Sequence, residues 1–325
     1  MQTRELGYTD LHLTTVGLGT YAIGGPQWRW GWGPQDDAES IAALRRGLDL
    51  GINWIDVAPA YGVGHGEEIV GLVIAGRRDE VIISTKCGLA WDEDKDSPDV
   101  HGLLKAESVR VECEASLKRL NVDAIDLYQI HWPLDEEHLE EAWSTIADLI
   151  REGKVRYGGV SNFSVEQLRR VQAIHPVASL QPPYSMLERG VEEELLAYCA
   201  ANDIGVIAYS PMQNGLLTGK YTKERIAGLP DNDWRKESPH FSEPAISATL
   251  ALIEGLRPIA VRNDKTLAQL AIAWVLRRPE VTAAIVGSRR PSQIEETAIA
   301  GDWVLSAEDT AEIDALLAAR EDTLG

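Results

Sequence analysis

The feature that most constrains the fold of this chain is a repeated alternation between short β-branched runs and longer segments with helical spacing. Continuous apolar runs such as Val81-Ile82-Ile83 are typical of strands that are covered on both faces, as in a parallel sheet. Eight runs are expected to be strands, at 16–20, 53–57, 81–86, 125–131, 156–161, 177–181, 205–210 and 283–288.

The segments between these runs carry apolar residues at the spacing of amphipathic helices. In 106–120 and 137–150 the apolar residues recur every one to four positions and form a stripe along one face. A further helix is expected at 307–320, where Ser306 precedes the first turn and Asp309 stands at its third position. That pair resembles a capping box and predicts where the helix begins.

Eight strand–helix units favour a closed (β/α)8 TIM barrel over an open doubly wound sheet, which usually has fewer strands and a break halfway. A barrel of this kind needs roughly 250 residues plus its loop insertions. The 325 residues would also accommodate two ordinary domains, but the uninterrupted alternation predicts a single domain over 1–325. The longest irregular stretch, 211–244, follows the seventh strand and is expected to be a long loop beside the active site.

Charge and composition exclude several classes of partner. The formal net charge of −20 repels nucleic acid and anionic lipid, so neither is expected to bind. The three cysteines are far apart in the chain and are expected to be free thiols in a reducing cytoplasm. No apolar stretch is long enough to span a membrane, and a cytoplasmic location is therefore expected. The oligomeric state does not follow from the sequence.

One acidic stretch has the spacing of a metal loop. Asp92, Asp94 and Asp96 match the start of a calcium-binding loop. The sixth and twelfth positions of that loop are Ser97 and Leu103, where glycine and glutamate are needed. The stretch is therefore expected to be a solvated acidic loop, and no metal site is predicted.

Polar side chains stand at the ends of the expected strands. In a parallel barrel the C-terminal ends of all strands lie on one face, and enzymes of this fold carry their chemistry there. The residues at or just beyond these ends are Asp56, Tyr61, Lys86, His131, Ser161, Asn162, Gln181, Tyr209, Ser210, Gly287, Ser288 and Arg289. Polar groups scattered along the chain are thus expected to meet at one mouth of the barrel.

Four of these residues form a set suited to proton transfer. A free phenol has a pKa of about 10, too high for ready proton transfer at neutral pH. A neighbouring ammonium group at Lys86 is expected to lower the pKa of Tyr61, and Asp56 to keep that lysine charged. His131 is placed to orient a substrate oxygen. Such a set can protonate a carbonyl oxygen while a hydride arrives at the carbon.

Sequence motifs in a fixed order cover nearly the whole chain. They are Gly17-Leu18-Gly19-Thr20, Asn53-Trp54-Ile55-Asp56-Val57-Ala58-Pro59-Ala60-Tyr61-Gly62, Ile83-Ser84-Thr85-Lys86, Asp126-Leu127-Tyr128-Gln129-Ile130-His131, Gly158-Gly159-Val160-Ser161-Asn162, Gln181-Pro182-Pro183-Tyr184-Ser185, Tyr209-Ser210-Pro211 and Ile285-Val286-Gly287-Ser288. On these residues the chain resembles the aldo-keto reductases. The resemblance implies a (β/α)8 barrel and NADPH-dependent reduction of aldehydes or ketones to alcohols.

The resemblance also implies roles for individual residues. Asp56, Tyr61, Lys86 and His131 correspond to the catalytic tetrad of the family, with Tyr61 as the proton donor. Ser161, Asn162 and Gln181 would hold the carboxamide of the cofactor, and Tyr209 would stack on its nicotinamide ring. The other cofactor contacts that it implies are Thr20, Ser210, Pro211, Met212, Gly215, Lys220, Gly287, Arg289, Gln293, Glu296 and Thr297.

Three positions bear on how the cofactor would be bound. A planar cation such as Arg289 suits a 2′-phosphate, which favours NADPH over NADH. Arg290 is adjacent, so the sequence does not decide which of the two meets the phosphate. Thr297 stands where the family often has asparagine, which weakens the expected adenine contact.

The sequence leaves several interpretations open. Tryptophans at 28, 30, 32, 91 and 132 follow strands one, three and four, and either pack the barrel rim or form an aromatic pocket. In the second case Tyr21, Trp28, Trp91 and Trp132 would contact a small apolar or sugar-like carbonyl substrate. Either Ser161 or Ser164 caps the next helix. An alternative function is an NAD(P)-binding barrel that acts as a redox sensor or regulatory subunit with little turnover.

Overall fold

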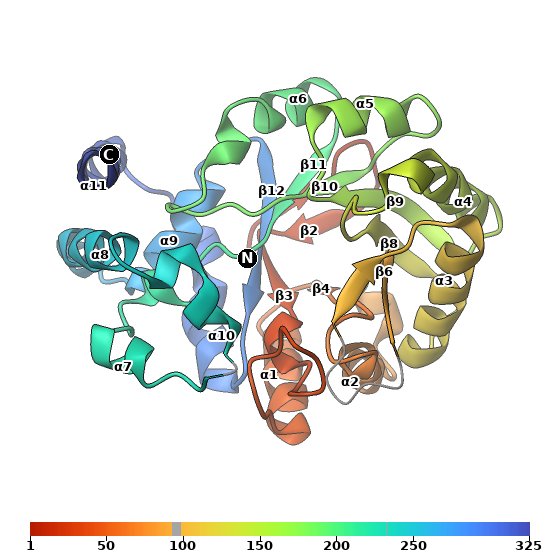
Figure 1. Cartoon of the computed structure of the whole chain (residues 1–325), viewed down its shortest axis with the longest axis horizontal. Coiled ribbons are helices and arrows are strands. Elements are labelled where there is room, and N and C mark those ends of the chain that lie inside the picture. Colours follow the sequence, from red (N-terminus) through yellow and green to blue (C-terminus); the bar gives the residue numbers. More distant parts are fainter. Residues whose placement is uncertain (93–98, 232) are drawn as a thin grey trace.

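A computed structural model describes residues 1–92, 99–231 and 233–325. Within these ranges the parallel strands form a closed eight-stranded barrel, which closes where the last strand pairs with the first (Figure 1). The barrel strands are β3 (Val16–Gly19), β4 (Trp54–Asp56), β5 (Ile82–Cys87), β8 (Ile125–Ile130), β9 (Val155–Ser161), β10 (Ser179–Gln181), β11 (Gly205–Ala208) and β12 (Val281–Gly287). The predicted (β/α)8 barrel and the positions of its strands are confirmed.

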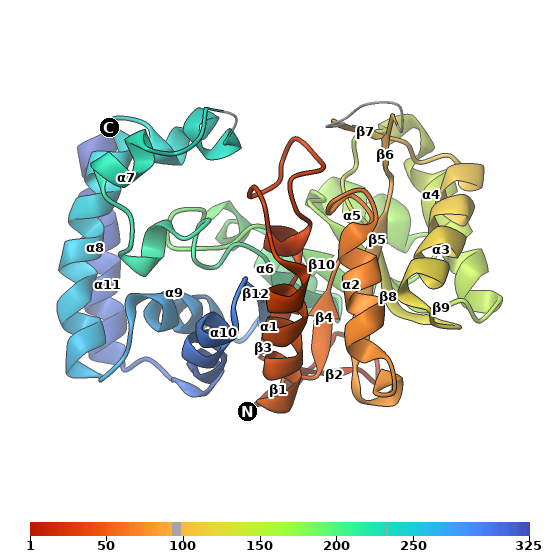
Figure 2. The ribbon, with the colours of Figure 1, turned by 90° about the horizontal axis from the view of Figure 1, so that it is seen from below.

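Helices surround the barrel on its outer face (Figure 1). They are α1 (Asp37–Asp49), α2 (His65–Ile74), α3 (Ala106–Leu120), α4 (Leu139–Arg151), α5 (Val165–Gln172), α6 (Leu195–Ala201), α9 (Leu267–Leu276) and α10 (Pro291–Ala298). Two longer helices, α8 (Ala245–Arg262) and α11 (Ala307–Leu324), lie side by side at one edge (Figures 1 and 2). None of the helices within the described residues has the length and apolarity that a bilayer-spanning segment needs.

Side-chain caps explain where two helices begin. The Ser164 hydroxyl accepts a hydrogen bond from the N–H of Gln167, and the Gln167 side chain accepts one from the N–H of Ser164. This reciprocal capping box makes Ser164, and not Ser161, the cap of α5. At α11 the Ser306 side chain accepts from the N–H of Asp309, as the sequence predicts. That helix runs four residues beyond its expected end, to Leu324.

Two antiparallel hairpins were not predicted. One pairs β1 (Thr3–Glu5) with β2 (His12–Thr14), and the other pairs β6 (Leu89–Trp91) with β7 (Val100–Gly102). Figure 2 shows them at opposite ends of the barrel. Strands of three residues are too short to display a period in the sequence. The acidic residues Asp94 and Asp96 lie outside the described residues.

The stretch 211–244 is less irregular than expected. It contains the short helix α7 (Lys223–Ala227) and several single 3₁₀ turns. Leu216, Tyr221 and Phe241 from this stretch form a small apolar cluster with Ile246 of α8. The cluster packs the loop against the body of the protein at the end of the barrel where β6 and β7 also lie (Figure 2).

Candidate active site

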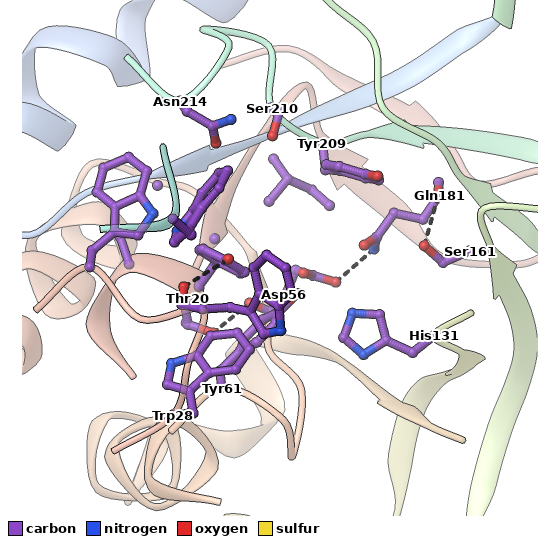
Figure 3. Close-up of a pocket in the computed structure, with 18 of the residues that line it drawn as sticks. Thr20, Trp28, Asp56, Tyr61, His131, Ser161, Gln181, Tyr209, Ser210 and Asn214 are labelled. Atoms are coloured by element: carbon purple, nitrogen blue, oxygen red, sulfur yellow. Dashed lines mark hydrogen bonds between the residues drawn. The ribbon is translucent and has the colours of Figure 1, made fainter. Parts of the chain in front are cut away.

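The C-terminal ends of the barrel strands open into one cavity of about 770 Å³ (Figure 3). This volume lies in the usual range of small-molecule sites. Asp56, Tyr61 and His131 line the cavity; the first two come from the end of β4 and the loop after it, and His131 follows β8. Lys86 lies directly behind them and is fully buried. The structure therefore brings the four predicted catalytic residues together at one mouth.

Lys86 is held by hydrogen bonds on several sides. Its ammonium nitrogen lies 2.8 and 2.9 Å from the two carboxylate oxygens of Asp56 and 3.0 Å from the carbonyl oxygen of Val57. The same nitrogen lies 3.4 Å from the hydroxyl oxygen of Tyr61. Burial lowers the pKa of Lys86, and the charge and hydrogen bonds of Asp56 oppose that fall. A buried ammonium group thus stands in contact with both a carboxylate and a phenol.

The expected lowering of the Tyr61 pKa is not observed. Burial raises the pKa of the Tyr61 phenol well above its usual value, and the Asp56 carboxylate raises it further. The prediction was wrong because it counted only the attraction of Lys86, whose charge is matched by Asp56 at contact distance. A buried phenol also loses the water that would solvate its phenolate. At neutral pH Tyr61 therefore carries its proton.

His131 is neutral in this environment. Burial lowers the pKa of the His131 imidazole well below its usual value, and the positive charge of Lys86 lowers it further. Its ring centroid lies 5.7 Å from that of Tyr61, and the two rings are nearly perpendicular. Figure 3 shows the imidazole and the phenol on the wall of the same cavity. A neutral imidazole there can donate a hydrogen bond without carrying a charge.

Amide and hydroxyl groups form the adjacent wall. The Ser161 hydroxyl donates to the backbone oxygen of Gln181 over 2.8 Å, and the Tyr209 hydroxyl donates to the Asn162 side-chain oxygen over 2.8 Å. The Gln181 side-chain amide donates to a carboxylate oxygen of Asp56 over 2.8 Å (Figure 3). Ser161, Asn162, Gln181 and Tyr209 all line the cavity. The other predicted cofactor contacts that line it are Thr20, Ser210, Pro211, Met212, Gly215, Gly287, Arg289 and Gln293.

Arg289 places a cationic group on another part of the cavity wall. The Arg289 guanidinium donates to the side-chain oxygen of Gln35 over 2.5 Å and to the backbone oxygens of Trp32 and Pro34. Its hydrogen bonds thus go to neutral oxygens rather than to a carboxylate. Arg290 is not among the residues that line the cavity, and its side chain lies 3.8 Å from the carboxylate of Glu39.

Besides Lys86, four residues named from the sequence do not line this cavity. Lys220 and Glu296 lie beside each other, with the ammonium nitrogen 3.3 Å from a carboxylate oxygen. The Thr297 hydroxyl donates to the backbone oxygen of Gln293 within α10. Trp91 ends the short strand β6.

The aromatic wall contains a residue that the sequence analysis missed. Tyr21, Trp28 and Trp132 line the cavity as expected, and so do Trp30, Trp32 and Trp234. Trp234 comes from the long loop after β11, and its ring centroid lies 6.3 Å from that of Trp30. A lone tryptophan in a polar stretch is the sequence signal that could have identified it. Other apolar lining residues missed from the sequence are Leu89, Val100 and Leu134.

Comparison with known proteins identifies the family. Residues 15–318 match the model of the Aldo/keto reductase family. This chain belongs to that family. It is 39% identical over 320 residues to the aldo-keto reductase YhdN of Bacillus subtilis, covering 98% of this chain and 94% of the relative. It is 33% identical to an NADH-specific methylglyoxal reductase of Escherichia coli, covering 95% of this chain and 96% of the relative.

Solved structures agree with the assignment. The glycerol dehydrogenase AKR11B4 from Gluconobacter oxydans superposes with a TM-score of 0.87 and 37% identity, covering 98% of this chain and 96% of the other. The aldo-keto reductase AKR11C1 from Bacillus halodurans gives a TM-score of 0.80 at 25% identity, over 97% and 96% of the two chains. As a member of this family, the chain is an NAD(P)H-dependent oxidoreductase.

Proposed function

We propose that this aldo-keto reductase reduces aldehydes or ketones to alcohols with NADPH, and that Tyr61 is the general acid. The observation that carries the proposal is the contact between the Lys86 ammonium group and the Tyr61 hydroxyl, 3.4 Å apart at the cavity wall. Lys86 is in turn paired with Asp56. Arg235 also donates to a phenol, that of Tyr221, but neither of these two residues lines the cavity.

The proton step follows from this arrangement. A carbonyl oxygen that lies between Tyr61 and His131 accepts hydrogen bonds from the phenol and the neutral imidazole. A reduced nicotinamide held by Asn162, Gln181 and Tyr209 would supply the hydride to the carbonyl carbon. The Tyr61 O–H bond breaks as its proton passes to the substrate oxygen, and Lys86 stabilises the phenolate that remains. The carbonyl is reduced to an alcohol, and the dihydronicotinamide is oxidised.

The residues of the cavity suit a nicotinamide dinucleotide phosphate. The amide side chains of Asn162 and Gln181 offer both donors and acceptors for the carboxamide, and Tyr209 offers an aromatic face. Arg289 offers a guanidinium that, within residues 1–92, 99–231 and 233–325, has no carboxylate at hydrogen-bond distance, which suits a 2′-phosphate. The relatives of this chain differ in their cofactor, since one is NADH-specific and another is named for NADP(+). Arg289 is our reason for proposing NADPH.

The aromatic wall points to small neutral carbonyl compounds as substrates. Trp28, Trp30 and Trp132 line the cavity together with aliphatic side chains, so the substrate side offers mainly apolar contact area. Asp99 is a carboxylate on this side, and it accepts from the indole N–H of Trp30 and from Arg29, which matches its charge.

The test of the proposed function is Tyr61→Phe, which removes the proton and keeps the ring. We expect kcat for aldehyde reduction to fall by roughly 10²–10⁴-fold, the usual contribution of a general acid, with the Kd for NADPH unchanged. Tyr184→Phe is a matched control, since Tyr184 is a buried phenol outside the cavity. Near-normal reduction by Tyr61→Phe would refute the role. NADPH binding without consumption over a broad aldehyde panel would favour the redox sensor.

A further inference from the structure

The interior of the barrel just below the active site is polar. Barrels of this fold usually fill their interior with bulky branched apolar side chains. Here Ser84 of β5, Gln129 of β8 and Ser179 of β10 are essentially inaccessible to solvent. Burying an amide and two hydroxyls costs free energy unless each is hydrogen-bonded. The partners of these groups therefore show what the polar layer does.

The three side chains form one directed chain of hydrogen bonds that ends on Asp56. The Ser179 hydroxyl donates to the Gln129 side-chain oxygen over 3.2 Å. The Gln129 side-chain nitrogen donates to the Ser84 hydroxyl oxygen over 2.8 Å. Because Ser84 accepts from Gln129, its single hydrogen is directed to the Asp56 carboxylate, where it donates over 3.1 Å.

The strand next to Gln129 leaves room for this chain. Gly159 of β9 is paired in register with Gln129. A side-chain carbon at position 159 would lie 2.3 Å from the Ser179 hydroxyl oxygen and 3.0 Å from a side-chain carbon of Gln129. The missing side chain at Gly159 is therefore what allows the amide of Gln129 and the hydroxyl of Ser179 to meet inside the barrel.

Asp56 receives hydrogen bonds from below and from the cavity wall. Ser84 donates from within the barrel, Gln181 donates from the wall, and Lys86 donates to both carboxylate oxygens. Each donated bond draws negative charge density away from the carboxylate. The charge that the Asp56–Lys86 pair presents to Tyr61 therefore depends on whether Ser84 donates or turns away.

We propose that Gln129 is a positioning residue for carbonyl reduction, because it fixes the Ser84 hydroxyl toward Asp56 and so tunes the charge that Asp56 and Lys86 present to Tyr61. The inference rests on the proposed role of Tyr61. Gln129 itself is buried and does not line the cavity. It acts through Ser84 and does not touch the reacting atoms.

The sign of the effect follows from the groups around Tyr61. The Asp56 carboxylate raises the pKa of Tyr61, and so do the phenols of Tyr21 and Tyr209 across the cavity. Behind β5, the Glu67 carboxylate of α2 acts on Lys86, and His131, which follows β8, is neutral. When Ser84 no longer donates, the carboxylate of Asp56 keeps more of its charge. The pKa of Tyr61 then rises further.

The test is Gln129→Met, which keeps the length of the side chain and removes its donor and acceptor. We expect kcat for alcohol oxidation, in which the Tyr61 phenolate must accept a proton, to fall roughly tenfold at neutral pH. The limb of the kcat–pH profile that reports Tyr61 should move to higher pH. The KM for the alcohol and the Kd for NADP+ should stay within about twofold, since Gln129 does not reach the cavity.

Two further variants separate positioning from packing. Ser84→Ala should reproduce the alkaline shift, and the double variant should shift no further than either single one, because both remove the same bond. Ser179→Ala removes the donor to Gln129 but leaves the bonds from Gln129 to Ser84 and from Ser84 to Asp56. It should lower Tm and leave the pH profile in place. If Gln129→Met does not fold, Ser84→Ala carries the test alone.

The inference is overturned if Gln129→Met lowers Tm while kcat and the pH limb stay where they are, or if the limb moves to lower pH. Additive shifts in the double variant with Ser84→Ala overturn it as well. Failure of the proposed function looks different, because Tyr61→Phe would then retain activity whatever Gln129→Met does. A nearly inactive Tyr61→Phe with an unshifted Gln129→Met would refute the positioning role alone.

Discussion

Replacing Lys86 by methionine is the sharpest perturbation of the proposed mechanism. Methionine has a similar length and no charge, so it fills the same space next to Asp56 and Tyr61. The substitution leaves the Asp56 carboxylate buried with donors only from Ser84 and Gln181 among the residues that the structure describes. It also removes the cation that would stabilise the Tyr61 phenolate.

The size of the catalytic effect can be worked out from the distance. An ammonium and a full phenolate charge 3.4 Å apart attract by about 5 kcal/mol at an effective dielectric constant of about 20. If about half of that charge has developed in the transition state, the loss is about 2–3 kcal/mol, which is on the order of 10²-fold in rate. The unpaired carboxylate of Asp56 then repels the phenolate, so 10²-fold is the lower bound.

The same substitution lowers stability, and the two effects can be separated. Removing one partner of a buried ion pair usually costs about 3–5 kcal/mol, because the other charge is left without compensation. Adding Asp56→Asn to Lys86→Met removes that charge. We expect the double variant to regain most of the lost unfolding free energy in urea titrations, but not the lost turnover.

The assay is the single-turnover loss of NADPH absorbance with an aldehyde in excess, with the Kd for NADPH measured separately by fluorescence. Lys86→Met should lower the rate at least a hundredfold and leave the Kd within about threefold, because Lys86 does not line the cavity. Turnover within tenfold of the unsubstituted enzyme would refute the electrostatic argument. Recovery of the rate in the Lys86→Met/Asp56→Asn variant would show that the single variant lost activity through misfolding.

Three further results are expected. Arg289→Ala should raise the Kd for NADPH by about 10–100-fold in fluorescence titration and that for NADH less than threefold; equal losses for both cofactors would contradict a phosphate contact. Burial raises the pKa of Glu112 to about 7. The contribution of Glu112 to the free energy of unfolding is therefore fully present below pH about 4.5, and it is lost as the pH rises through about 7. Glu112→Gln should therefore flatten the fall in unfolding free energy over that interval by about 3 kcal/mol, and an unchanged slope would show that Glu112 does not titrate there. Ser164→Ala removes the cap of α5 and should cost about 1 kcal/mol in urea unfolding; an unchanged free energy of unfolding would contradict the capping assignment.

The barrel could be predicted because short runs with β-branched residues alternate with helical segments in a regular order along the chain. That order reveals even a strand of three residues, such as β10 (Ser179–Gln181). The hairpins β1–β2 and β6–β7 have strands as short, but they lie outside that alternation. Their pairing depends on contacts between distant segments, such as the hydrogen bond from the Trp54 indole to Thr14, and no local pattern contains that information.

The convergence of the site was also predictable, but its electrostatics were not. Polar residues at strand ends must meet in a parallel barrel, so Asp56, Lys86 and His131 could be placed together from the sequence. Whether Lys86 lowers the pKa of Tyr61 depends on burial and on the distance to Asp56, which the sequence does not contain. The ion pair between Lys220 and Glu296 could not be predicted from the sequence either, because it depends on the distance between two segments that lie far apart in the chain.

Net charge and local charge are separate properties of this protein. The chain as a whole carries a formal charge of −20, yet the reacting end of the cavity is close to neutral. Asp56 and Lys86 cancel each other, and both Tyr61 and His131 are uncharged at neutral pH because burial disfavours their ions. A neutral carbonyl therefore meets no electrostatic barrier there. In the mechanism that we propose, the phenol proton and, behind it, Lys86 would stabilise the charge that forms on the oxygen during hydride transfer.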